Sequence, residues 1–229
     1  MPDLKKLFHR KKTHPISDPI QDIREKLGLE ASLIPSLSQT RAGEWAPYET
    51  FCTTGRFSRL NGEKFVQHCA PTAITNLILT LHARYHYPQV EGLTPEEIFS
   101  RAAAIGRRRL LYINKKLFNF WGGSSVVLIS LYLRACLKAF GIRDRRIRLH
   151  FLSTPRRAAR ALEEGKLLML QVYFHKTYGT HSVVAYGLQN VQSADGRIRT
   201  YITLADGWAD RPRYLALEDT RLLGYCTIS

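Results

Sequence analysis

The chain has 229 residues, 45% of them hydrophobic, and a formal net charge of +15 at pH 7. A chain of this length can bury one sizeable core, so we expect a single globular domain. Its basic start lacks the apolar run of a secretory signal peptide, and no run of about 18 apolar residues predicts a membrane-spanning helix. We therefore expect a cytoplasmic protein, with delivery by a non-classical route left open.

The four cysteines contain no Cys-x-x-Cys pair and no regular spacing, which favours a reducing compartment over a disulfide framework. The paired ligand spacing of structural zinc sites is also absent. Gly122–Ser125 is rich in glycine and serine but lacks the lysine of a phosphate-binding loop. We accordingly expect neither a metal nor a cofactor.

Basic residues gather in several clusters, the longest from Arg143 to Arg148. Positive charge attracts acidic partners and nucleic acid, although scattered exposed basic residues usually serve solubility. Charge therefore predicts possible partners and says nothing about the fold.

Residues 1–45 are charged and interrupted by prolines, with one short helical candidate around Asp22–Leu27. We expect a mobile or loosely docked arm there, followed by one domain over residues 46–229.

A helix is predicted to begin at Cys69, because Ala73, Ile74, Leu77, Ile78 and Leu81 repeat with helical spacing. Pro71 suits a first helical turn, where its missing N–H is no loss. A thiol at this position lies close to unpaired backbone N–H groups and the positive end of the helix, which favour the thiolate. Asn76 returns to the same face and predicts a buried hydrogen-bonding residue.

Three further helices are predicted downstream. The first opens with Thr94-Pro95-Glu96-Glu97 and ends by Gly106, and the second runs from Val126 to Phe140 with Gly141 as its stop. The third opens at Thr154-Pro155 and continues through Leu162, before Gly165.

The pattern then changes to strands. Apolar runs of strand length cover Lys166–Phe174, Ser182–Leu188, Arg199–Asp206 and Leu222–Ile228. Asp195-Gly196 predicts a hairpin turn before the third of them. Helices followed by an antiparallel sheet make an α+β protein.

The order Cys69, His181, Asp206 suggests a nucleophilic site. Ile202, Leu204 and Asp206 share one strand face by period two, so we expect Asp206 beside His181 on an adjacent antiparallel strand, both facing the start of the Cys69 helix. Other interpretations stay open: an inert core cysteine, or an Asp206-Gly207 turn.

The rival site residues are His175, at a strand end near His181, and Asp210, which follows Asp206 closely. Either could replace its neighbour without changing the type of site.

The chain resembles papain-like cysteine peptidases in three segments, which are Cys69–Ala73, Gly179–Gly187 and Leu204–Trp208. The resemblance spans roughly residues 60 to 210 and is greatest to the branch related to bacterial peptidases that remove double-glycine leader sequences. It implies a papain-like fold in which a helical amino-terminal part carries the nucleophile helix and packs against an antiparallel sheet.

By this resemblance Cys69 is the nucleophile, His181 the base, and Asp206 the residue that orients the imidazole. The family usually has glutamine six positions before the cysteine, where this chain has Glu63; Gln67 is the nearest amide and the candidate for binding the oxyanion. The family's glycine after the cysteine is replaced by Ala70.

The expected function is a thiol-dependent hydrolase that cleaves an amide or peptide bond of a peptide or protein substrate through an acyl-enzyme. Deamidation or transamidation would use the same residues. The alternative is a catalytically impaired papain-like scaffold that uses its basic surface to bind nucleic acid or acidic partners.

Overall fold

The computed structural model describes residues 31–35, 51–117, 121–175, 178–193, 198–210, 212–218 and 220–229. Within these ranges no helix combines the length and the apolar character needed to cross a bilayer.

The helices of the described residues are α3 (Cys69–Tyr85), α4 (Pro95–Arg108), α5 (Ile129–Ala139) and α6 (Pro155–Glu163). The strands are β1 (Ala31–Pro35), β2 (Arg59–Leu60), β3 (Glu63–Lys64), β4 (Ile113–Leu117), β5 (Trp121–Gly123), β6 (Ile147–Phe151), β7 (Leu167–His175), β8 (Gly179–Ser193), β9 (Ile198–Ala205), β10 (Arg213–Ala216) and β11 (Leu222–Ile228).

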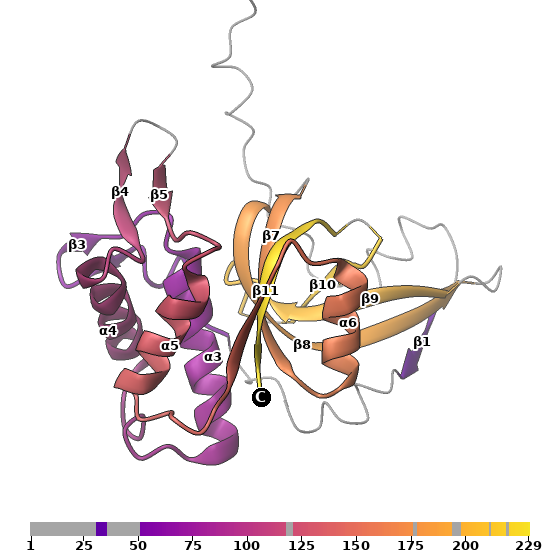
Figure 1. The fold of residues 1–229 in the computed structure, drawn as a ribbon, viewed down its shortest axis with the longest axis horizontal. Coiled ribbons are helices and arrows are strands. Elements are labelled where there is room, and N and C mark those ends of the chain that lie inside the picture. The colour runs from indigo at the N-terminus through magenta and orange to yellow at the C-terminus, as the bar shows by residue number, and fades with distance from the viewer. Residues whose placement is uncertain are drawn as a thin grey trace, which may run out of the picture.

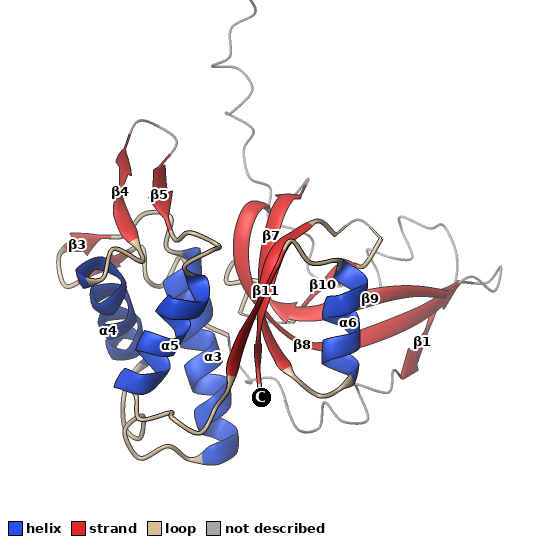
Figure 2. Ribbon diagram, in the orientation of Figure 1, coloured by secondary structure: helices blue, strands red, loops and turns tan. Residues whose placement is uncertain are grey.

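An antiparallel sheet separates two groups of helices. In the described residues its strand order is β10-β9-β8-β7-β11-β6, with β1 paired to β8 outside this path. Helices α3, α4 and α5 lie together on one side, and α6 covers the other face (Figures 1 and 2). The expected α+β class is confirmed.

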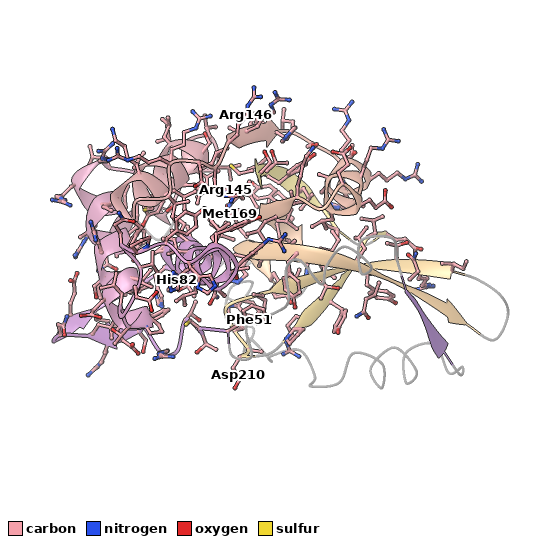
Figure 3. All side chains as sticks on the ribbon, turned by 90° about the horizontal axis from the view of Figure 1, so that it is seen from below. Phe51, His82, Arg145, Arg146, Met169 and Asp210 are labelled. Carbon is pink, nitrogen blue, oxygen red and sulfur yellow. The ribbon has the colours of Figure 1, made fainter. Side chains whose placement is uncertain are left out.

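The first six residues of β7 are buried on both faces, which explains why this part of the strand is apolar except for Gln171. Leu167 and Met169 join the core formed with α3, α4 and α5, whereas Leu168 and Leu170 join the core formed with α6. Figure 3 labels Met169. The sheet is therefore the common wall of two cores, and a side chain's parity in the strand decides which core it enters.

Helix α4 has the predicted start, because Thr94 and Glu97 form a reciprocal capping box and Pro95 occupies the first turn. The prediction that Gly106 ends this helix is wrong. Gly106 lies inside α4, and a Cβ there would lie 2.7 Å from atoms of Tyr112 and Tyr132. Close tertiary packing, rather than helix termination, requires glycine at this position.

Several predicted boundaries move in the structure. Helix α5 begins three residues after Val126, and β8 extends well past the predicted Leu188. The sequence did not predict the short strands β4, β5, β6 and β10. In β6, basic residues interrupt the apolar sequence that marks the longer strands. Strand β11 has the predicted bounds.

Most of the arm expected over residues 1–45, including the helical candidate Asp22–Leu27, lies outside the described residues. The exception is β1, an unpredicted strand that pairs antiparallel with Gln189–Ser193 of β8. The Asp195-Gly196 turn also lies outside the described residues.

Asn76 fixes the segment before α3 to the helix. Its Oδ1 accepts from the Cys52 backbone N–H at 2.8 Å, and its Nδ2 donates to the Cys52 carbonyl at 3.0 Å. Asn76 is 2% exposed. The prediction of a buried hydrogen-bonding residue is confirmed.

We expect Asn76→Ala to lower the free energy of unfolding by about 2 kcal/mol, because it leaves two buried backbone groups of Cys52 without their partner. Thr80→Val is the matched control on the same helix, since Thr80 only donates to the Asn76 carbonyl of its own helix. Urea denaturation measures both changes. Equal losses in the two variants would contradict the assigned role of Asn76.

Candidate functional site

Cys69 is the first residue of α3, and it has the most exposed position of the four cysteines. The other three, Cys52, Cys136 and Cys226, are buried, and burial raises the pKa of each thiol. Helix α3 has no acidic residue in its first turn, so no carboxylate there opposes a thiolate.

His181 lies near the start of β8, and its imidazole lowers the pKa of the Cys69 thiol. It pairs with Val172 of β7, and α3 packs against β8. The imidazole is 5% exposed. Residues 112 positions apart in the chain are thus brought together by the packing of a helix start on a strand start.

The two groups shift each other's pKa in opposite directions. Burial alone would raise the pKa of Cys69, but the hydrogen bond and charge of His181, helped by Ser182, bring it down to about 7. Burial alone would lower the pKa of His181, but its contact with Cys69 outweighs this effect and raises that pKa. A thiolate and an imidazolium therefore stabilise each other near neutral pH.

Asp206 orients His181 through its backbone. The carbonyl oxygen of Asp206 lies 2.5 Å from His181 Nε2, which leaves Nδ1 as the ring nitrogen for Cys69. His181 and Asp206 do lie on or beside adjacent antiparallel strands, β8 and β9, as expected.

The Asp206 side chain requires a correction, because we expected it to face the start of α3. Its Oδ1 accepts from the backbone N–H groups of Trp208 at 2.8 Å and Ala209 at 2.9 Å. Its Oδ2 accepts from the Tyr178 hydroxyl at 3.2 Å and lies 3.6 Å from Arg213 Nε. A fully buried carboxylate needs such partners, and the turn after β9 supplies them, as the turn interpretation of Asp206-Gly207 anticipated.

Two aromatic rings enclose the His181 imidazole. Tyr178 stacks on it with ring centroids 5.6 Å apart, and Trp208 lies 4.8 Å away at a tilt of 41°. Apolar rings beside the imidazole restrict its rotation and reduce its contact with water.

Ser182 is a residue of the candidate site that the sequence interpretation missed. Its backbone N–H and its hydroxyl both interact with the Cys69 sulfur and lower the pKa of the thiol. The hydroxyl also donates to Gln171 Oε1 at 2.8 Å, and Gln171 is 3% exposed. The only available signal was Gln171 itself, a lone polar residue in the apolar run of β7 that needs a buried partner.

The Gln171 side chain also carries a hydrogen-bond donor, its Nε2 amide group. Its Nε2 is buried without a hydrogen-bond partner among the described residues. The oxygen and nitrogen of a side-chain amide can exchange places by a rotation of the group. If Nε2 faced Ser182, it would donate to the serine oxygen, and the hydroxyl proton could then form a hydrogen bond with the Cys69 thiolate. Ser182, held by Gln171, is thus a second polar group acting on Cys69, separate from His181.

The residues considered for the oxyanion, Glu63 and Gln67, have other contacts in the structure. The Glu63 carboxylate contacts Arg107 and accepts from Asn114 Nδ2 at 3.0 Å. Gln67 is exposed, adopts a φ of +49°, and lies against Gly123. No hydrogen bond of the Gln67 side chain occurs within the described part of the chain, so the structure provides no support for its expected role.

The rival residues are used elsewhere. His175 Nδ1 accepts from the Tyr178 backbone N–H at 3.3 Å in the connection between β7 and β8. Asp210 is exposed, and its backbone carbonyl accepts from the Phe51 N–H at 2.9 Å; Figure 3 labels both residues. Neither replaces His181 or Asp206 at the thiol.

A metal site is not evident in the described ranges, which contain no group of three His, Cys, Asp or Glu side chains placed to hold an ion. The chemistry available at this site is that of a thiol and an imidazole.

A scan of protein-family models and a search of curated proteins each found no match to the chain. The assignment of chemistry consequently depends on the geometry described above.

We expect Ser182→Ala to raise the pKa of Cys69 by about 0.5 to 1 unit, because one hydrogen bond to the thiolate is lost while the backbone N–H remains. The rate of iodoacetamide labelling measured against pH gives this pKa. Thr203→Val, which removes another buried hydroxyl of the sheet, is the control and should leave the midpoint unchanged. A midpoint that stays near 7 in Ser182→Ala would count against the contact.

We expect Asp206→Asn to keep most of the labelling rate of Cys69, within about tenfold, because the backbone carbonyl that holds His181 is unchanged. The free energy of unfolding should fall by about 2 kcal/mol, since the buried charge facing Arg213 is lost. Labelling and urea denaturation measure the two effects separately. If the carboxylate oriented the imidazole, Asp206→Asn would instead label as slowly as His181→Ala.

Proposed function

We propose that this protein is a thiol-dependent hydrolase that cleaves an amide or peptide bond, with Cys69 as nucleophile and His181 as general base and acid. The observation that carries the proposal is the position of Cys69 at the start of a helix that packs against the strand bearing His181, together with the opposite pKa shifts of these two residues. Inert core cysteines instead have raised pKa values, as Cys136 and Cys226 do.

The reaction begins with the thiolate and the imidazolium. The Cys69 sulfur attacks the carbonyl carbon and forms a C–S bond, and the C–N bond then breaks as His181 donates its proton to the departing amine. Neutral His181 next accepts a proton from water, whose oxygen attacks the thioester. Breaking the C–S bond releases the carboxylic acid and regenerates the thiolate. The Asp206 carbonyl keeps the ring oriented throughout, because it accepts from Nε2.

The developing oxyanion needs hydrogen-bond donors, and the start of α3 offers them. The first N–H groups of a helix have no acceptor within it, and the Cys69 N–H belongs to that group. This supply is independent of Glu63 and Gln67. Ala70, which stands in place of the resembled family's glycine, is fully buried in the helix.

The proposed substrate is a peptide or protein, and the proposed fold family is that of the papain-like cysteine peptidases. Deamidation or transamidation would proceed through the same thioester, with a different leaving group or acceptor. The second candidate, an impaired scaffold with a binding role, is favoured by one observation: Glu63 is held by Arg107 and Asn114 where the resembled family has its oxyanion glutamine.

The decisive experiment combines thiol labelling with peptide cleavage. Limiting iodoacetamide at pH 7 should label Cys69 at least tenfold faster than the other cysteines, with a midpoint of about 7. His181→Ala should raise that midpoint, since the effect of burial then acts without the imidazolium. Incubation with a diverse peptide library, followed by mass spectrometry of new termini or deamidated glutamines, identifies the bond that is cleaved.

Cys69→Ser should abolish both cleavage and deamidation, while Cys226→Ala, which removes a buried thiol elsewhere, should retain them. Equal labelling of all cysteines in the folded protein, unchanged by His181→Ala, would overturn the hydrolase proposal. Fast labelling of Cys69 without any turnover would favour the impaired scaffold.

A further inference from the structure

We propose that a pocket between α5 and β6 binds a phosphate group, carried either by a small phosphorylated molecule or by a nucleic-acid backbone. The pocket has a volume of about 430 Å³. Its remaining lining is aliphatic, and its charged lining consists of Arg134, Lys138, Arg143 and Arg145.

The charge of this lining is almost uncompensated. No carboxylate is among the lining residues of the pocket. The one acidic residue between positions 134 and 147 is Asp144, and it is already engaged by Arg145 at 3.1 Å and by the Tyr87 hydroxyl at 2.8 Å. Four cations around one cavity repel each other until an anion enters.

Two of the four cations are held in place before any ligand binds. The Arg145 guanidinium lies 3.6 Å from the centroid of the Tyr85 ring, and its Nε donates to the Tyr87 hydroxyl at 3.0 Å. Arg134 donates to the Ile147 carbonyl at 2.8 Å. Each guanidinium has further N–H groups that these contacts do not occupy. The planar arrangement of guanidinium donors matches the oxygens of a phosphate group.

The other two cations are available to close on the ligand. Among the described residues, neither the Lys138 nor the Arg143 side chain has an ion-pair or hydrogen-bond partner, and both residues are exposed. Lys138 lies one helical turn after Arg134, so the two positive charges share a face of α5. Their mutual repulsion destabilises the helix slightly, and a bound anion would remove this repulsion.

The surrounding surface is also basic. Residues 134–166 contain ten lysines and arginines against three acidic residues. Burial, followed by the charges of Arg148, Lys166 and Arg157, lowers the pKa of His150 on β6. Arg145 and Arg146 are labelled in Figure 3, where side chains ending in nitrogen gather along the edge beyond Arg146. Such a field raises the local concentration of polyanions.

This pocket is separate from the thiol site. Ile147 aligns through Ile228 of β11 with Leu167, the first residue of β7, whereas His181 aligns with Val172. Five residues of strand correspond to about 17 Å. The proposal therefore does not depend on the proposed hydrolase, and either can fail alone.

The test uses the full chain and inorganic pyrophosphate as the probe, with binding measured by calorimetry at two salt concentrations. We expect one saturable site, weakened at least tenfold in Lys138→Gln/Arg143→Gln. The matched control is Arg108→Gln/Arg109→Gln, which removes the same charge from exposed positions at the end of α4 and should change the affinity less than twofold. Neither pair touches Cys69 or His181, so thiol labelling should be unchanged in both.

A short single-stranded oligonucleotide distinguishes the sources of phosphate. If it competes with pyrophosphate and is weakened by the Lys138/Arg143 pair, the site serves a nucleic-acid backbone; if it does not compete, the site serves a small phosphorylated molecule. Equal weakening of pyrophosphate by the two double variants, or no saturable binding, would overturn the proposal and leave only a general effect of net charge.

Discussion

The contact between the Cys69 thiol and the His181 imidazole joins the helical side of the molecule to its sheet, and much of the structure serves to hold the two groups together. Cys69 can meet His181 only because α3 lies against β8 with its first residue level with the start of the strand. The core shared by α3 and the sheet, which includes Ile74, Leu77 and Val184, fixes that alignment. A shift of one helical turn would separate the groups by about 5 Å.

A buried carboxylate supports this contact indirectly. The turn after β9 wraps its N–H groups around the Asp206 side chain, with Tyr178 and Arg213 beside it, and this arrangement points the Asp206 carbonyl at His181. The negative charge still acts through space and helps to raise the pKa of the imidazole. One residue thus stabilises the turn with its side chain and orients the base with its backbone.

The charge of the chain is distributed unevenly with respect to the site. His181 and Ser182 lower the pKa of the Cys69 thiol, and aromatic rings enclose the His181 imidazole. The basic residues of α5 and its connection to β6 lie toward the opposite end of the sheet. The basic surface and the candidate thiol site are therefore in different parts of this fold.

The sequence by itself determined the helix start at Cys69, the capping of α4 and α6, and the apolar strands β7, β9 and β11, since periodicity and capping are local properties. It also indicated His181. Only the tertiary structure decided that Asp206 meets the ring through its carbonyl, that Ser182 acts on the Cys69 thiol, and that Gln171 holds Ser182. Periodicity assigns a side chain to a face, but the register shift between Val172 and His175 and the packing of α3 decide which atoms touch.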